Sequence, residues 1–285
     1  MGRYRKILVA VDGSDSSKNA FRQACRIGRD NSSWITVIST IPLYNDQFEV
    51  LSIKEKVSGT LRAEGERILA EVKKIAVEED AFIKTVLEEG TPFDTIVDTA
   101  EEGNFDLIVM GRRGRRNLER VLVGSVTARV IGNSQRDILV VPRGSSVGWN
   151  LIILATDGSR YSRSAMEKAI DLAKSYGGRI KAVSVVDVTD EFQALAPEAV
   201  DRLVEASRGF VEEVRKKAEA EGVGAEPVVR EGETYQVITE LAKKSAADVI
   251  VMGSHGRTGV KRLLMGSVTE KVIGYAPCPV LVVRG

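Results

Sequence analysis

The sequence has few of the residue types that build disulfide-linked, metal or nucleophilic sites. In 285 residues there are two cysteines and one histidine, and Cys25 and Cys278 stand in different halves with no CxxC spacing. This usage excludes a disulfide framework and gives no sign of a zinc site. It favours two small buried side chains in a protein kept in a reducing compartment. We therefore expect a cytoplasmic protein.

Long apolar runs and an excess of one charge are also missing. No run approaches the roughly 18–20 apolar residues of a membrane span. The first residues, MGRYRKILVAVDGS, are typical of an amino-terminal strand rather than of a signal peptide. The formal net charge is +1, with 41 Lys and Arg against 40 Asp and Glu. That balance argues against a duplex nucleic-acid binder, so we expect neither a membrane nor a nucleic acid as partner.

An internal duplication dominates what is present. KILVAVDGS at 6–14 returns as LIILATDGS at 151–159, and DLIVMGRRGRRNLERVLVGSVT at 106–127 returns as DVIVMGSHGRTGVKRLLMGSVT at 248–269. In the longer pair 13 of 22 positions are identical, and the order of the blocks is the same in both halves. Chance does not produce such an ordered set. We place the domains at 1–144 and 149–285, joined by the Gly/Ser-rich stretch around 143–150.

Each copy alternates strands and helices. The strands predicted in the first copy are 5–11, 35–41, 82–87, 106–110 and 138–141, and the helices are 16–29, 52–79, 93–102 and 124–132. In the second copy the strands are 151–155, 180–186, 225–230, 248–252 and 279–283, and the helices are 160–176, 197–221, 233–245 and 266–274. Near-continuous runs of Ile, Leu and Val are typical of parallel strands buried on both faces. The predicted fold class is α/β: two tandem, doubly wound, Rossmann-like parallel sheets of five strands.

A glycine-rich loop follows the fourth predicted strand of each copy, with the spacing G-x-x-G-x9-G-S in both. Glycines let backbone N–H groups approach an anion with no Cβ in the way. The Gly-Ser pair opens a helix, whose free amides and positive dipole end favour a phosphate. Ligands of such sheets bind beyond the carboxyl ends of the strands, where these loops lie. Tight turns of a duplicated fold are the simpler alternative for the glycines.

This long motif, together with Asp12 and Asp157 after the first strands, closely resembles the universal stress protein family in its ATP-binding branch. The resemblance covers nearly the whole chain, as two family domains. It implies ATP (or AMP or ADP) with Mg²⁺ as the cofactor, and it assigns no catalytic residue and no metal ligand in the protein. It also implies that the final strands, 138–141 and 279–283, pair with each other. The chain would then form a pseudo-dimer, and association of two chains into a homodimer stays open.

The resemblance assigns nucleotide contacts position by position. In the first copy they are Asp12, Thr40, Met110, Gly111, Arg113, Gly114, Gly124, Ser125 and Val126. In the second copy they are Asp157, Val185, Met252, Gly253, His255, Gly256, Gly266, Ser267 and Val268. The aspartates lie against the nucleotide, the second-strand residues hold adenine through backbone groups, and the first loop glycine lies beside the ribose. The remaining loop positions contact phosphate. Helix capping is an alternative role for the aspartates, and both roles can hold together.

The two loops differ after their second glycine. The second copy continues with the usual family run Gly256-Arg257-Thr258-Gly259, whereas the first has Gly114-Arg115-Arg116-Asn117. Asparagine tolerates left-handed backbone, so we expect the first loop to close as well. Arg112, Arg113, Arg115, Arg116 and Arg120 make that loop basic, either as a solvated face or as an extra phosphate clamp. His255 is interpreted as a phosphate-side hydrogen-bonding group rather than a catalytic one.

Three functions remain in view. The first is a nucleotide-binding stress or regulatory protein. The second is a slow Mg-dependent ATPase, although neither loop has a G-K-[ST] lysine and no activated nucleophile recurs in both copies. The third is an interaction scaffold that binds no nucleotide. The long amphipathic segments 52–79 and 197–221 favour core packing with a wet outer face over membrane-surface binding.

Overall fold

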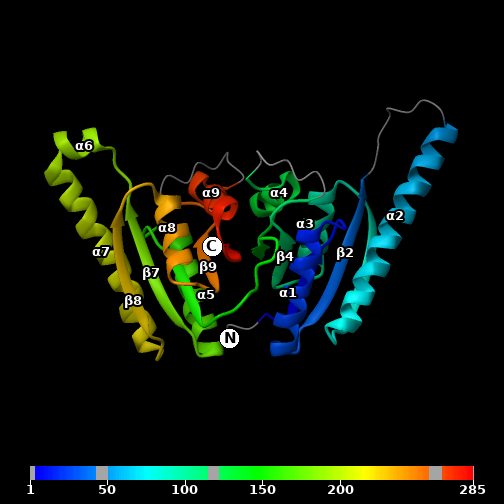
Figure 1. The fold of residues 1–285 in the computed structure, drawn as a ribbon, viewed down its shortest axis with the longest axis horizontal. Helices are drawn as coiled ribbons and strands as arrows, with labels where there is room; N and C mark the ends of the chain where they lie inside the picture. The colour runs from blue at the N-terminus through cyan, green and yellow to red at the C-terminus, as the bar shows by residue number, and fades with distance from the viewer. Residues whose placement is uncertain (1–3, 43–50, 115–121, 257–264, 285) are drawn as a thin grey trace. The chain divides into compact units, whose positions relative to one another are not determined.

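The computed structural model of the protein describes residues 4–42, 51–114, 122–256 and 265–284, and in 51–56 only the course of the helix. The chain divides into two compact units, Tyr4–Gly144 and Ser145–Gly285 (Figure 1). We call them the first and the second domain and describe each by itself.

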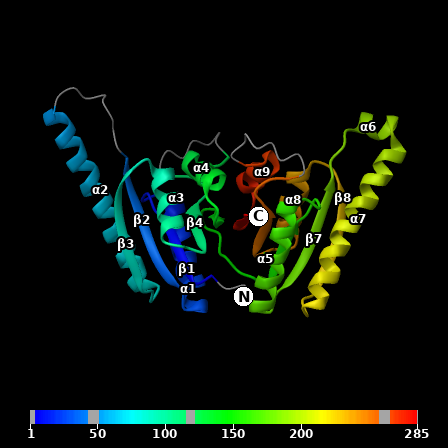
Figure 2. The same cartoon turned by 180° about the vertical axis from the view of Figure 1, so that it is seen from behind.

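The first domain is one parallel sheet with the strand order β3-β2-β1-β4-β5. Its elements in chain order are β1 (Lys6–Ala10), α1 (Asp15–Asn31), β2 (Trp34–Pro42), α2 (Leu51–Glu78), β3 (Ile83–Gly90), α3 (Pro92–Glu102), β4 (Leu107–Gly111), α4 (Ser125–Asn133) and β5 (Asp137–Val141). Helices α1 and α2 contact each other on one face of the sheet, and α3 and α4 contact each other on the opposite face (Figures 1 and 2).

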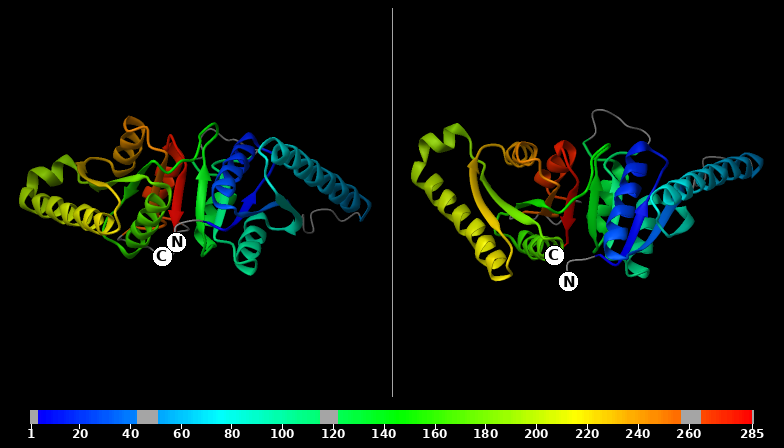
Figure 3. Two further views of the ribbon diagram at one scale, coloured as in Figure 1. Left: turned by 90° about the horizontal axis from the view of Figure 1, so that it is seen from below. Right: turned by 60° about the horizontal axis from the view of Figure 1, so that its bottom comes forward.

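The second domain repeats this arrangement with the strand order β10-β9-β6-β7-β8. Its elements are β6 (Leu151–Ala155), α5 (Arg160–Tyr176), β7 (Arg179–Val186), α6 (Asp190–Leu195), α7 (Pro197–Ala220), β8 (Ala225–Glu231), α8 (Thr234–Lys244), β9 (Val249–Gly253), α9 (Ser267–Tyr275) and β10 (Val280–Val283). Helices lie on both faces of this sheet too (Figure 3). The predicted α/β class with two doubly wound parallel sheets of five strands is confirmed. Pairing of the final strands between the domains stays a prediction.

One helix was not predicted. The short α6 begins after Thr189, whose hydroxyl accepts a hydrogen bond from the N–H of Phe192 at 3.2 Å. Asp190 and Glu191 occupy its first turn, where carboxylates favour the helix dipole. Its side chains are not buried. Because no apolar face recurs at helical spacing over six residues, periodicity had nothing to detect.

The central strands form the core because they are apolar on both faces. In β1 the side chains of Ile7, Leu8 and Val9 are fully buried, and Leu107 to Val109 of the neighbouring strand β4 are buried as completely. A strand covered by helix layers on both sides has no solvent face, so its residues do not alternate in polarity. This explains the continuous apolar runs in the sequence.

The strand order fixes where a ligand can bind. From β1 the chain winds outward through β2 and β3, then returns to the other side of β1 with β4 and β5. Strands β1 and β4 lie next to each other at this switch point, and the connections at their carboxyl ends run to opposite sides of the sheet. In doubly wound sheets this divergence opens a crevice. In the second domain β6 and β9 take the same places. The predicted aspartates and glycine loops follow these four strands.

Candidate functional site

The first loop glycine of each copy brings the end of one strand against the start of a helix. A Cβ on Gly111 would lie 2.8 Å from the carbonyl carbon of Ser16 and 2.9 Å from the amide nitrogen of Ser17. In the second domain a Cβ on Gly253 would lie 2.8 Å from the carbonyl carbon of Tyr161. Backbone atoms stand in the way in both cases, so only glycine fits at these positions.

The aspartates face two ways. Asp12 Oδ1 accepts from the N–H of Ser14 at 3.0 Å and from its hydroxyl at 2.6 Å, which fixes the turn after β1. Its other oxygen, Oδ2, faces the loop, because a Cβ on Gly114 would lie only 2.5 Å from it. The side chain that caps the helix itself is Ser14, which accepts from the N–H of Ser17. Asp12 thus joins the β1 turn to the glycine loop.

Asp157 makes the same connection in the second domain. Its Oδ1 accepts from the N–H of Ser159 at 3.0 Å, and a Cβ on Gly256 would lie 3.0 Å from its Oδ2. Ser159 caps α5 through the N–H of Ser162 at 3.2 Å. The capping alternative for the aspartates therefore holds only in part: they order the turn, and the serines two residues later cap the helices.

The helices that open after the loops begin without a side-chain cap among the described residues. Gly124 is the N-cap of α4, and its N–H donates to the carbonyl of Arg112 at 2.9 Å, which closes the loop. In the second domain the N–H of Gly266 donates to the carbonyl of Ser254 at 2.9 Å before α9. The first-turn N–H groups of α4 and α9 are thus available to an anion, unlike the starts of α1 and α5.

A threonine in each copy, missed in the sequence analysis, secures this geometry. Thr127 Oγ1 donates to the carbonyl of Gly111 at 3.1 Å, and Thr269 Oγ1 donates to the carbonyl of Gly253 at the same distance. Each hydroxyl ties the first turn of the helix to the end of the central strand. The repeated G-S-V-T was the signal that could have shown it, since the threonine recurs with the rest of the motif.

Two cationic side chains stand at the first site. Burial, together with the neighbouring charge of Arg113, lowers the pKa of the Arg112 guanidinium. Arg113 Nε is buried and has no hydrogen-bond partner among the described residues. Thr40 Oγ1, on β2, is also buried without one. Buried donors that lack a partner are rare in folded proteins, so these two atoms single out this part of the domain.

The second site has a different chemistry at the aligned position. His255 Nδ1 lies 3.2 Å from Ser254 Oγ, and its ring lies against that of Tyr161 with centroids 5.4 Å apart. The guanidinium of Arg160 lies 4.6 Å from the Tyr161 ring centroid. The ring of His255 therefore has an aromatic neighbour on α5, which the sequence analysis did not foresee.

The remaining predicted contacts take up three kinds of position. Met110 and Met252 are buried at the ends of β4 and β9. Thr40 and Val185 lie two residues beyond Ile38 and Val183. The carbonyls of Ile38 and Val183 accept hydrogen bonds from the N–H groups of the residues directly after β1 and β6. The first helical turns carry Ser125, Ser267, Val126 and Val268. Arg115, Arg116, Asn117, Arg120, Arg257, Thr258 and Gly259 lie outside the described residues.

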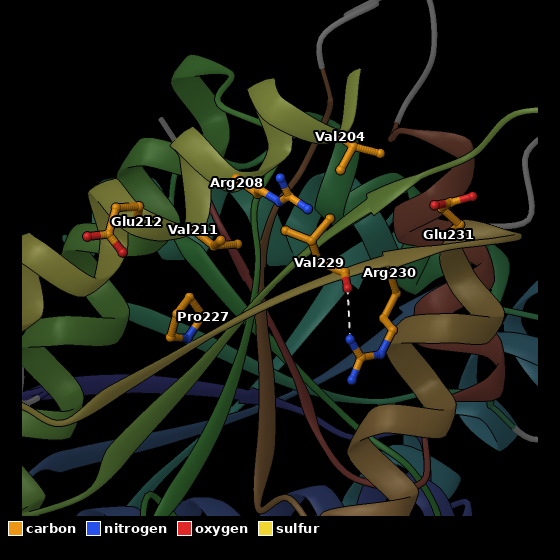
Figure 4. A pocket seen from close by; sticks show the side chains of 8 residues that line it. All are labelled: Val204, Arg208, Val211, Glu212, Pro227, Val229, Arg230 and Glu231. Atoms are coloured by element: carbon orange, nitrogen blue, oxygen red, sulfur yellow. Dashed lines mark hydrogen bonds between the residues drawn. The ribbon is translucent and has the colours of Figure 1, made fainter. Parts of the chain in front are cut away.

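A groove in the described part of the second domain lies elsewhere. It measures about 660 Å³ and lies between α7 and the edge strand β8, lined by Val204, Arg208, Val211, Glu212, Pro227, Val229, Arg230 and Glu231 (Figure 4). Its charges are satisfied locally: Arg230 donates to the carbonyl of Val229 at 2.9 Å, and Glu212 accepts from Arg215. It contains none of the predicted nucleotide contacts.

In the described part of the chain, no three His, Cys, Asp or Glu side chains are grouped so as to hold a metal ion. No helix among the same residues has the length and apolar character that crossing a bilayer requires.

The two cysteines give a prediction of their own. Burial, reinforced by Glu79, raises the pKa of the Cys25 thiol to about 12, and burial with Asp248 nearby raises the pKa of Cys278 to about 12. Since the thiolate is the reactive form, the folded protein should not react with an aromatic disulfide reagent at pH 8, whereas the unfolded chain should release two equivalents of thiolate. The free energy of unfolding should be unaffected below the unfolded pKa of about 8.5 and should fall as the pH rises toward 12. Rapid reaction of the folded protein would contradict this.

The fold and the strand-end loops define a class: doubly wound α/β domains with a glycine-rich loop at the switch point of the sheet. Comparison with known proteins makes this specific. The model of the universal stress protein family matches residues 3–142 and again 149–284, so the chain belongs to this family as two tandem domains.

Some relatives match about half of this chain, and others match all of it. The universal stress protein MJ0531 of Methanocaldococcus jannaschii is 41% identical over 138 residues, which is 47% of this chain and 81% of that protein. Rv2005c of Mycobacterium tuberculosis is 28% identical over 304 residues, covering 100% of this chain and 99% of that one. A universal stress protein from Archaeoglobus fulgidus shares the fold with a TM-score of 0.75 and 22% identity, over 99% of this chain and 97% of its own.

Proposed function

We propose that each domain binds one adenine nucleotide, with ATP as the preferred ligand, and that the protein acts as a nucleotide-dependent regulator in stress. The phosphates would lie on the glycine loop and the first turn of α4 or α9. The base would lie beyond the carboxyl ends of β1 and β2, or of β6 and β7, and Mg²⁺ would accompany the phosphates.

The observation that carries the proposal is the pairing of an uncapped helix start with a glycine loop at the switch point of the sheet. Gly124 and Gly266 leave the first amides of α4 and α9 without a side-chain partner among the described residues. At the first site the buried Nε of Arg113 adds a donor in need of an acceptor. Phosphate oxygens satisfy such donors, and the helix dipole adds to the attraction.

Binding without rapid turnover fits the residues better than catalysis. Phosphoryl transfer needs positioned charge and an oriented nucleophile. Near the loops the described side chains supply hydrogen-bond donors and one aspartate in each domain. Asp12 and Asp157 are already committed to Ser14 and Ser159 through one oxygen each. Slow hydrolysis of ATP is the alternative, which incubation with Mg-ATP and chromatography of the products would reveal.

Isothermal titration calorimetry on nucleotide-stripped protein tests the proposal. We expect two equivalents of ATP per chain in the presence of Mg²⁺, weaker binding of AMP because it lacks the loop-bound phosphates, and much weaker binding of GTP. Mass spectrometry of the nucleotide released on denaturation should identify an adenine nucleotide. A flat titration with a protein that unfolds cooperatively would refute the function.

A further inference from the structure

The first domain exposes two large aromatic side chains at the end of its sheet opposite to the glycine loop. Trp34 begins β2 and is 80% exposed, and Phe82, the residue before β3, is 95% exposed. Because Ile35 pairs with Ile83 in a parallel register, Trp34 and Phe82 stand next to each other on adjacent strands. Val77, in the last turn of α2, is 81% exposed. We call Trp34 and Phe82 the aromatic patch.

The second domain shows that the fold does not need an apolar group at these positions. There Arg179 begins β7, and Gly224 precedes β8, with Ile180 and Ala225 in register after them. A Cβ on Gly224 would lie 4.0 Å from the Cβ of Arg179, so side chains at these paired positions are in contact distance. The backbone at this sheet end is the same in both domains. The N–H of Trp34 donates to the carbonyl of Arg5, and the N–H of Arg179 donates to the carbonyl of Asn150.

Keeping both aromatic rings in water is unfavourable for the folded protein. Single exposed apolar residues are common on protein surfaces, but adjacent large ones mark a contact with something else. Aromatic side chains bury about 150–250 Å² each when covered. Two copies of the patch that cover each other bring together four rings and would therefore remove about 600–1,000 Å² from water, which is the size of a weak, transient protein–protein interface.

The surrounding charges distinguish a second copy of the chain from a membrane surface. The last turn of α2, which carries Val77, ends in Glu78 and contains no basic residue, and Glu79 follows it directly. The neighbouring Arg22 and Arg29 pair with these carboxylates. An anionic bilayer would need an excess of Lys and Arg here. Mixed and mutually paired charges around an apolar centre are instead the composition of a protein–protein interface.

We propose that the aromatic patch is the contact through which two copies of this chain associate about a twofold axis. In such an interface each patch meets the same patch of its partner, so its apolar centre is complementary to itself. The small area makes the dimer weak and dependent on concentration. This inference does not depend on nucleotide binding.

Sedimentation velocity of the full chain over a range of concentrations tests the proposal. The wild-type protein should move from a 31.0 kDa monomer toward twice that mass as its concentration rises. The double variant Trp34→Arg, Phe82→Gly introduces the residues of the second domain, which the same sheet end accommodates. Its dissociation constant should rise at least about tenfold, the loss expected when buried aromatic anchors are removed.

Fluorescence gives a second readout. The chain has two tryptophans, and Trp149 is 5% exposed, so a blue shift of the emission on concentrating the protein reports the burial of Trp34. A matched variant that transfers the patch, Arg179→Trp with Gly224→Phe, should increase association. The proposal fails if the wild-type protein stays monomeric at every concentration. It also fails if the double variant, shown to be folded by circular dichroism, associates as the wild type does.

Discussion

Replacing Gly253 with valine should abolish nucleotide binding at the second site and leave the first site intact. The new Cβ would lie 2.7 Å from the Cβ of Tyr161 and 2.8 Å from its carbonyl carbon. Since a backbone atom cannot swing aside, β9 and the start of α5 must separate. This displaces the carbonyl of Gly253 that anchors Thr269, and with it the first turn of α9. The phosphate-binding amides then lose their alignment, for which we expect at least about a hundredfold loss of affinity.

Calorimetry should show one equivalent of ATP per chain for this variant in place of two. The corresponding variant of the first domain, Gly111→Val, should also bind one equivalent, at the second site, since its Cβ would meet Ser16 and Ser17. Gly209→Ala is the matched control, because a Cβ at that helical position has no heavy atom within 4 Å. It should bind two equivalents and gain about 0.5–1 kcal/mol of stability. Two equivalents bound by Gly253→Val would show that the loop does not hold the nucleotide.

The sequence predicted the fold well because the duplication reports each element twice and the strands are buried on both faces. Strand β6, Leu151–Ala155, and helix α5, Arg160–Tyr176, have the predicted bounds. Apolar runs and serine caps determine such elements locally. Helix α6 depends on a single turn capped by Thr189, and no periodic pattern distinguishes it from a loop.

The site was predictable only as far as the motif extends. The motif gave the glycines and aspartates, but not which side chains of other elements meet them. The contact of the His255 ring with the Tyr161 ring depends on the close approach of β9 to α5, which Gly253 permits. The exposure of Trp34 was equally invisible, because a tryptophan at the start of a strand is ordinarily assigned to the core. Contacts between distant segments follow from the packing and not from local spacing.

Replacing Arg113 with glutamate should abolish ATP binding at the first site. The Nε of its guanidinium is buried and has no partner among the described residues. The residue also lies close to the start of α4, since a Cβ on Gly124 would be 3.5 Å from the Cα of Arg113. A carboxylate there would face the phosphates with the opposite charge. At about 4 Å and an effective dielectric constant of about 20, each unit of charge changes the interaction by about 4 kcal/mol before screening. Even strongly discounted for solvent and salt, this gives at least about a hundredfold weaker binding.

The exchange of Arg113 for histidine tests the same charge by pH. Arginine stays protonated at all working pH values, whereas an imidazole loses its proton near pH 6.5. In Arg113→His, ATP affinity at the first site should rise as the pH falls from 8 to 5.5, because the introduced imidazole gains a positive charge beside the phosphates. The wild-type protein is the control, since its arginine keeps the same charge over this range. If the affinities of Arg113→Glu and Arg113→His equal that of the wild type across this range, the side chain does not face the phosphates, and the backbone amides of the loop and of α4 hold them alone.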